Sequence, residues 1–163
     1  MKIYEKMSDS ALRPILMDIV NEAESQELDI FDPSIVDSNF SDIMDIVDGE
    51  IETYIGNSSN VGHSAFEDST FFISILLMNK NFMTEPIKRP KRKVYKVNHT
   101  ITMNQTVYDT YENTYDTFLP LTKDILLNLQ ASGDYTALEG DMVNSYIEDS
   151  EIIADEIDSI EEL

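Results

Sequence analysis

Residues 80–103 read KNFMTEPIKRPKRKVYKVNHTITM, and this stretch is the part of the chain that is not acidic. It holds seven of the 11 Lys and Arg residues and one acid, Glu85, which makes a local balance of +6. The rest of the chain has four basic and 31 acidic residues, a balance of −27, and the two parts sum to the net charge of −21. A short basic element therefore interrupts a strongly anionic body.

The basic element predicts an extended or β insertion over residues 84–103. Pro86 and Pro90 disfavour a helix. From Tyr95 onward, apolar and polar residues alternate and β-branched residues are frequent, which is typical of a strand with one buried face. We expect a strand or hairpin near residues 91–103. Its partner is either the proline-containing segment before it, folded back, or a strand of another molecule.

Helical periodicity predicts the structure before this element. A first helix runs from caps at residues 8–10 to about Leu28. A second begins at Asp32-Pro33, or later near Ser38, and ends at Gly56, with Gly49 weakening it by about 1 kcal/mol relative to alanine. Residues 65–82 are apolar on nearly all sides and favour a buried helix at the centre of the core.

The C-terminal half also predicts helices. A heptad echo of Tyr108 and Tyr115 places the aromatic residues of 107–118 on neighbouring helix faces, and a proline then breaks the helix. Thr122 caps a further helix that Gly133 closes. Residues 134–163 have 11 acids and no base, and their apolar residues recur at three- and four-residue spacing. They predict an acidic helix that frays at its end.

These elements predict a mainly α single domain over residues 1–163, a helical bundle of five or six helices with a small β element. The chain has no cysteine, so disulfides and thiolate chemistry are excluded. Its opening residues turn polar at once, and the longest apolar run, residues 71–78, is too short to cross a bilayer. We expect a soluble protein of the cytoplasm without a membrane partner.

The run Tyr4-Glu-Lys-Met7, followed by Asp18-Ile-Val-Asn-Glu-Ala23, resembles a helix in the portal proteins of tailed phages. The resemblance covers about twenty residues of a chain much shorter than a portal. It implies phage structural genes as genomic company, with the host cytoplasm or the virion as the location.

Enzyme motifs are not found, so we expect no catalytic residue, no metal site and no cofactor. None of the five glycines builds a phosphate loop. His63 and His99 are not spaced with carboxylates as in di-iron sites, and each is interpreted as a packing residue. A calcium loop would begin near Asp37, but Asp42 stands where that loop needs glycine.

The basic cluster has three interpretations: a solvated loop that protects a strand edge, a nucleic-acid contact, and a docking surface for an acidic partner or another copy. The field of the −27 body opposes nucleic acid. The expected partners are therefore other proteins, within a homo-oligomer or larger assembly. The residues that carry this contact are Lys88, Arg89, Lys91, Arg92, Lys93 and Lys96.

Two function classes follow. The first is a non-enzymatic assembly protein, such as a phage-type adaptor or connector, that docks through the basic loop and strand and through acidic helices. The alternative is an acidic DNA mimic that inhibits a nucleic-acid-binding enzyme, of the anti-restriction or anti-CRISPR type, with carboxylates in place of phosphates. The acidic residues that carry the contact in this alternative are Asp42, Asp45, Asp48, Glu52, Glu148, Asp149, Asp155 and Glu156.

Overall fold

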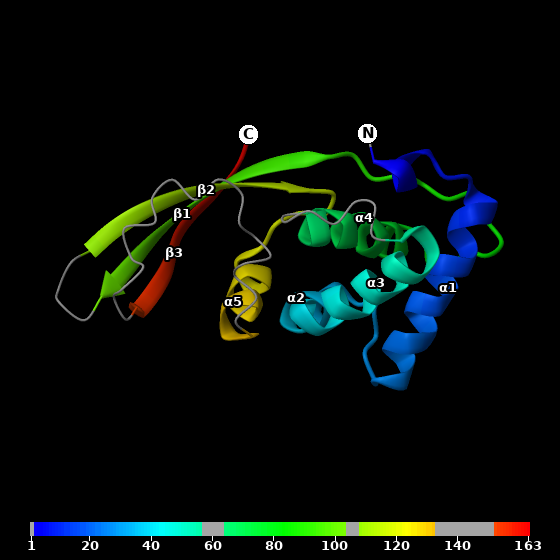
Figure 1. Cartoon of the computed structure of the whole chain (residues 1–163), viewed down its shortest axis with the longest axis horizontal. Helices are drawn as coiled ribbons and strands as arrows, with labels where there is room; N and C mark the ends of the chain where they lie inside the picture. The colour runs from blue at the N-terminus through cyan, green and yellow to red at the C-terminus, as the bar shows by residue number, and fades with distance from the viewer. Residues whose placement is uncertain (1, 57–63, 104–107, 133–151) are drawn as a thin grey trace.

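The computed structural model describes residues 2–56, 64–103, 108–132 and 152–163. Within these ranges the chain forms five α-helices and a three-stranded antiparallel sheet. Figure 1 shows α1 at one end of the molecule and the sheet extending away from the helices at the other. The fold is mainly helical with a small β element, as predicted.

The helices precede the sheet except for the last one, which follows β2. A short 3-10 helix, η1, leads into α1, and α2 and α3 are separated by a single residue. The bounds are η1 Ile3–Lys6, α1 Asp9–Ser25, α2 Pro33–Ser38, α3 Phe40–Ile55, α4 Ser64–Met78 and α5 Lys123–Ser132.

Local sequence signals explain where the first helices begin. The Ser8 hydroxyl accepts a hydrogen bond from the Ala11 N–H at 3.2 Å and caps α1. The Asp32 carboxylate caps α2 by accepting from the Ser34 N–H at 2.9 Å. Both predicted starts of the second helix are used, because α2 begins after Asp32 and α3 begins after Asn39.

The core is centred on α4, as the sequence predicts. Phe71 and Phe72 are buried, and the Tyr4 ring lies 4.6 Å from Phe71 and 5.5 Å from Phe72 between ring centroids. Phe118, which follows β2, completes this cluster at 5.2 Å from Phe71. Each buried side chain of this size stabilises the fold by roughly 1.5–3 kcal/mol, so the cluster joins the N-terminal segment, α4 and the sheet firmly.

The sheet has the order β2-β1-β3, so the basic strand is central. It consists of β1 Lys93–Met103, β2 Tyr108–Thr117 and β3 Ile152–Glu162. Tyr95 of β1 lies opposite Tyr115 of β2 and Glu162 of β3. The prediction of a folded-back segment or another molecule as partner is wrong, because both partner strands come from later in the same chain.

The predicted helix over residues 107–118 is also wrong, since 108–117 form β2. Asn113, Tyr115 and Thr117 are buried, whereas Thr114 and Asp116 between them are exposed. That alternation has the period of a strand, and threonine and tyrosine favour strands. The heptad echo of the tyrosines does not reflect a helical face.

The predicted acidic helix over 134–163 is wrong where the structure describes it, because 152–162 form β3; residues 134–151 lie outside the described ranges. Asn98 pairs with Ser159 but His99 pairs with Ile157, which leaves Asp158 as an extra bulged residue. The bulge places Ile157 and Ile160 on the same face despite their three-residue spacing. Helix-like spacing therefore arises here from a bulged strand.

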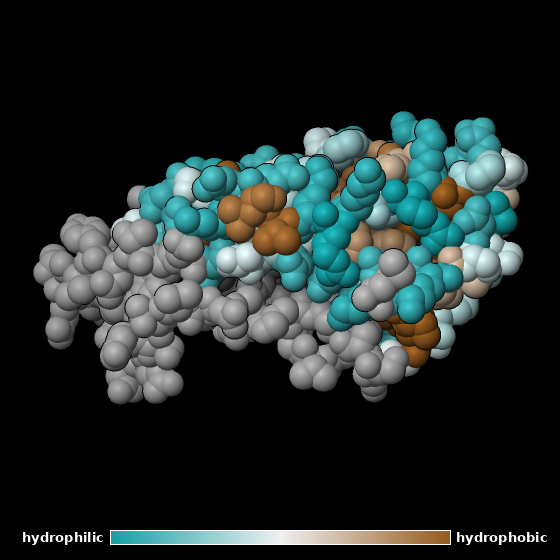
Figure 2. Space-filling view, turned by 90° about the horizontal axis from the view of Figure 1, so that it is seen from above, coloured by the Kyte–Doolittle hydropathy of each residue, from teal (hydrophilic) through white to brown (hydrophobic). Residues whose placement is uncertain are grey.

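One face of the molecule is mostly polar where the structure describes it. Figure 2 shows one face on which hydrophilic residues predominate and hydrophobic surface is confined to separate patches. Of the helices in the described ranges, none combines the length and the apolar character that a membrane crossing requires.

Candidate functional site

A groove with an apolar floor lies where α2, the end of α4, the segment leading into β1 and the connection from β2 to α5 meet. Its volume is about 620 Å³. Met78, the last residue of α4, is 45% exposed and lines it, so we name it the Met78 groove. The other apolar lining residues are Pro33, Leu77, Pro90, Phe118, Leu119 and Pro120.

The Met78 groove carries charges of both signs on its walls. Arg89, Lys91 and Lys93 line it from the segment that leads into and begins β1. Asp37 of α2 lines it together with Thr122, whose hydroxyl donates to Asp37 Oδ2 at 3.2 Å. Burial raises the pKa of the Asp37 carboxyl above its ordinary value. The cationic wall is thus the more extensive of the two.

Hydrogen bonds hold the backbone of the basic segment in place. The Asn79 side chain donates to the Lys88 carbonyl at 3.0 Å and accepts from the Lys88 N–H at 2.8 Å. The Asp9 carboxylate accepts from the Ile87 N–H at 3.0 Å and pairs with Arg89 at 2.7 Å. These contacts, with the Ile87 hydrogen bond the largest, lower the pKa of Asp9. The cationic wall is therefore preorganised.

Arg92 connects the basic segment to two other parts of the fold. Its Nη2 lies 3.3 Å from Glu5 Oε2, and its Nη1 pairs with Glu67 of α4. The guanidinium carbon stands 4.7 Å from the centroid of the Phe118 ring, within the range of a cation–π contact. Since Phe118 lines the Met78 groove, Arg92 fixes one wall of the groove to the N-terminal segment.

Tyr4 anchors that N-terminal segment on α4. Its phenol is fully buried and donates to Asp68 Oδ1 at 2.5 Å. Lys2 Nζ lies 3.8 Å from the same oxygen. Burial, followed by the hydrogen bond to Asp68, raises the pKa of Tyr4 above its ordinary value. Tyr4 therefore keeps Glu5 next to Arg92.

Three of the six predicted basic contact residues are paired within the chain. Arg89 and Arg92 form the ion pairs described above, and Lys93 Nζ lies 3.9 Å from Glu162. Arg89, Arg92 and Lys93 therefore already have carboxylate partners within the chain. Moreover, β1 is paired on both edges, so it cannot accept a strand from another molecule.

The other three basic residues occupy different places. Lys88 and Lys91 are exposed and form no ion pair with a carboxylate of the described ranges. Lys96 is half-buried on β1, opposite Thr114 and Glu161. Lys91 is thus the cation that combines exposure with a place in the wall of the Met78 groove.

Carboxylates gather in a second groove, lined by α1 and α3, with a volume of about 470 Å³. Glu22 lines it from α1, and Asp42, Asp45 and Glu50 line it from α3. Burial raises the pKa of Glu50, and the charges of Asp18 and Glu22 raise it further. This acidic groove therefore has a concentrated negative potential.

The predicted acidic residues are only partly brought together. Asp42 and Asp45 share the acidic groove, and Glu52 is exposed outside it. Asp48 is half-buried instead of exposed, burial raises its pKa, and its Oδ1 has no hydrogen-bond partner among the described residues.

The remaining predicted acidic residues belong to the C-terminal part of the chain. Glu148 and Asp149 lie outside the described ranges. Asp155 and Glu156 belong to β3, at positions opposite Ile101 and Thr100 of β1, and not to a helix. The mimic hypothesis assumed a C-terminal acidic helix beside the second one, and the C-terminal acids that the structure describes lie on a strand instead.

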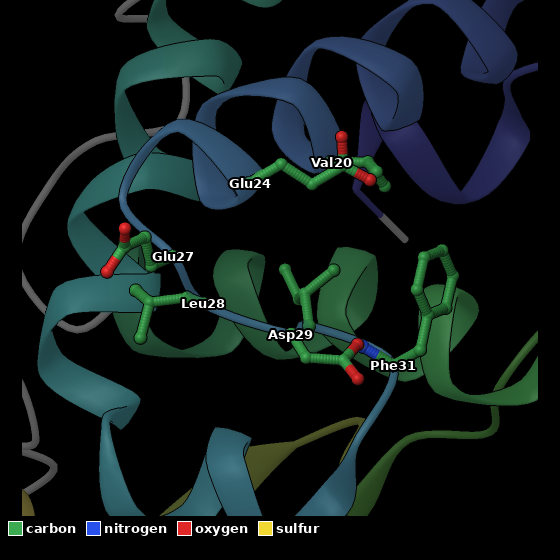
Figure 3. Close-up of a pocket in the computed structure, with 7 residues that line it drawn as sticks. Val20, Glu24, Glu27, Leu28, Asp29 and Phe31 are labelled. Atoms are coloured by element: carbon green, nitrogen blue, oxygen red, sulfur yellow. The ribbon is translucent and has the colours of Figure 1, made fainter.

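A smaller hollow of about 280 Å³ follows the C-terminal end of α1. In Figure 3, Val20 and Glu24 come from α1, while Glu27, Leu28 and Phe31 come from the connection to α2. Glu27 adopts a positive φ of 60°, and the Leu28 N–H bonds to the Ala23 carbonyl at 2.9 Å, which ends the helix. The hollow is therefore lined by three carboxylates, those of Glu24, Glu27 and Asp29.

Histidines and clustered carboxylates are the side chains that could hold a metal ion. His99 is buried and its Nε2 lies 2.7 Å from Asn113 Nδ2, as predicted for a packing residue; His63 lies outside the described ranges. In the part of the chain that the structure describes, no group of three or more His, Asp or Glu side chains is arranged to hold a metal ion. Comparisons with protein-family models, curated proteins and solved structures found no match.

The Met78 groove was missed at the level of sequence because four separate segments build it. The sequence predicts its cationic residues but not its apolar floor. The sequence carries one signal for it: the apolar run 71–78 ends at Met78, and Pro90 and Pro120 disfavour helices and strands in two of the other segments.

Proposed function

We propose that this chain is a non-enzymatic protein-interaction subunit of the adaptor or connector kind, which joins other proteins into an assembly. The observation that carries this proposal is the Met78 groove, an apolar depression with a preorganised cationic wall on an otherwise anionic molecule. Exposed apolar surface bordered by polar residues is typical of protein-binding sites. The portal-like run at residues 4–23 connects the proposal to phage structural proteins, and hence to the virion or the host cytoplasm.

The chemistry of the groove specifies the kind of partner segment. Leu77 and Met78 offer contact to a large apolar side chain, and Lys91 offers a charge to a carboxylate beside it. The backbone contacts of Asn79 and Asp9 hold the wall before the partner arrives, which lowers the entropic cost of binding. A partner segment should therefore combine an aromatic or aliphatic anchor with neighbouring acids.

Fluorescence anisotropy with labelled peptides tests the proposal. The panel contains peptides that carry a single Leu, Phe or Tyr followed by acidic residues, together with versions in which lysines replace the acids. Met78→Asp buries a carboxylate against the apolar anchor and should weaken binding at least about tenfold, while Lys91→Glu should affect only the acidic peptides. Met83→Asp is the matched control, because Met83 is 47% exposed and does not line the groove.

Binding that is equal for Met78→Asp and Met83→Asp would remove the Met78 groove as the site. Failure of every peptide to bind the wild-type chain would remove the proposed function in this form.

The acidic groove favours a second candidate, the DNA-mimic inhibitor. Asp42, Asp45 and Glu50 stand along α3, and burial, followed by the charges of Asp18 and Glu22, raises the pKa of Glu50. Under this alternative, Asp42→Asn together with Asp45→Asn should weaken inhibition of a panel of restriction endonucleases, whereas Met78→Asp should leave inhibition unchanged. Inhibition that survives the neutralisation, or is absent in the wild type, would exclude the mimic.

A further inference from the structure

An exposed aromatic residue lies beside carboxylates of α1 and α3. Tyr54, near the end of α3, is 45% exposed, and its hydroxyl donates to Asp18 of α1. Glu50 lies one turn earlier on α3, and the charges of Asp18 and Glu50 both act on Tyr54. We call Asp18, Glu50 and Tyr54 the Tyr54 patch.

The Tyr54 patch has the chemistry that the Met78 groove requires. It presents a large amphipathic ring with carboxylates around it, and the groove presents an apolar floor with Lys91 on its wall. The volume of about 620 Å³ is ample for an aromatic side chain. Tyrosine is enriched at interfaces because its ring buries apolar area while its hydroxyl keeps a polar partner.

We propose that the Tyr54 patch of one copy docks into the Met78 groove of a second copy. The proposal rests on the proposed function and names its partner as the chain itself. The two surfaces differ and are built by different elements: α1 and α3 form the patch, while α2, α4 and the segments flanking the sheet form the groove (Figure 1). A contact between unlike surfaces leaves a free patch and a free groove at the ends, so it propagates into a ring or a filament.

The contact is weak by itself. A single anchor in one groove buries less surface than the roughly 1,200–2,000 Å² typical of stable complexes. Self-association should therefore appear only at protein concentrations on the order of 100 µM. Many such contacts in series would reinforce one another once an assembly has nucleated.

Sedimentation velocity of two variants and their mixture tests the proposal. Met78→Asp removes the groove and leaves the patch, while Tyr54→Ser removes the patch and leaves the groove. Each variant alone should stay monomeric at concentrations where the wild type forms oligomers. An equimolar mixture should form 1:1 heterodimers and nothing larger, because each variant supplies one intact surface. Met83→Asp should assemble like the wild type, and circular dichroism checks that every variant is folded.

Three outcomes would overturn the proposal: a wild-type chain that stays monomeric throughout, oligomers that both variants still form, or a mixture that remains monomeric. The outcome for the proposed function is separate. If the wild type is monomeric but acidic peptides still bind the Met78 groove, only self-docking is excluded. If neither association is seen, both proposals fall.

Discussion

Replacing Tyr4 with phenylalanine should destabilise the fold by about 2–3 kcal/mol. The ring keeps its place against Phe71 and Phe72, so the loss is confined to the hydroxyl that donates to Asp68. A hydrogen bond to a charged group contributes about 1.5–3 kcal/mol when buried. Both residues are fully buried, which places the expected loss in the upper part of that range.

Urea denaturation and calorimetry measure this loss. For a chain of this size, about 2–3 kcal/mol corresponds to a melting temperature lower by roughly 4–12 °C. Tyr54→Phe is the matched control, because it removes an equivalent tyrosine–aspartate hydrogen bond from an exposed site and should leave the melting temperature unchanged. A Tyr4→Phe protein as stable as the Tyr54→Phe protein would refute the buried-anchor argument.

The same variant has a signature in alkali. The pKa of Tyr4 is raised in the folded chain, whereas in the unfolded chain the phenol ionises near its ordinary value of about 10. The unfolded state therefore loses this proton first, and the contribution of Tyr4 to stability declines above about pH 10 by up to about 1.4 kcal/mol per pH unit. The stability difference between wild type and Tyr4→Phe should shrink over that range. A difference that is constant up to pH 11 would contradict the assigned cause.

Three further predictions follow from charge and backbone conformation. Two copies of charge −21 with centres about 40 Å apart repel each other by on the order of 50 kcal/mol without salt, but by less than about 1 kcal/mol at a Debye length of about 8 Å. Light scattering should therefore show that self-association increases from low to physiological salt. A steady decrease of self-association with salt would contradict this. Because the pKa of Asp9 is lowered in the folded chain, its contribution to stability is present above the unfolded pKa of about 3.9 and is lost as the pH falls through the folded pKa. Asp9→Asn should therefore reduce the dependence of the unfolding free energy on pH in acid, and it should weaken peptide binding. A variant whose stability depends on acid pH as the wild type does would contradict this. Gly49→Ala should stabilise α3 by about 1 kcal/mol because a Cβ there meets nothing within 4 Å. Gly56→Ala should destabilise the fold because φ at this position is 79°. Melting temperatures that shift in the same direction for both variants would show the backbone argument to be wrong.

The helices were predictable because their signals are local. α1 shows six buried apolar positions at helical spacing behind a serine cap, and the second half of α4, residues 71–78, is apolar except for Ser74. The sheet was only partly predictable. β1 alternates clearly, but β2 is composed mainly of threonine, tyrosine and acids, and the bulge at Asp158 gives β3 the apolar spacing of a helix. Strand pairing depends on contacts between distant segments, which no local pattern reports.

The candidate site was predictable as a charge but not as a shape. The cluster from Lys88 to Lys93 is visible in the sequence, yet its pairing with Glu5, Asp9 and Glu67 arises only when the N-terminal segment and α4 fold against it. The floor around Met78 depends on the same packing. For this reason the sequence shows the cations of this segment but neither their ion pairs nor the groove that they line.

The position of β1 between an early and a late partner has a consequence for synthesis on the ribosome. β2 follows β1 after a short connection, but β3 begins 49 residues after Met103. At roughly 5–20 residues per second, the nascent chain leaves one edge of β1 uncovered for about 3–10 s. Lys93 and Lys96 lie on that strand, and charged residues along an open edge discourage pairing with neighbouring nascent chains. The lysines would thus be needed most before the native sheet exists.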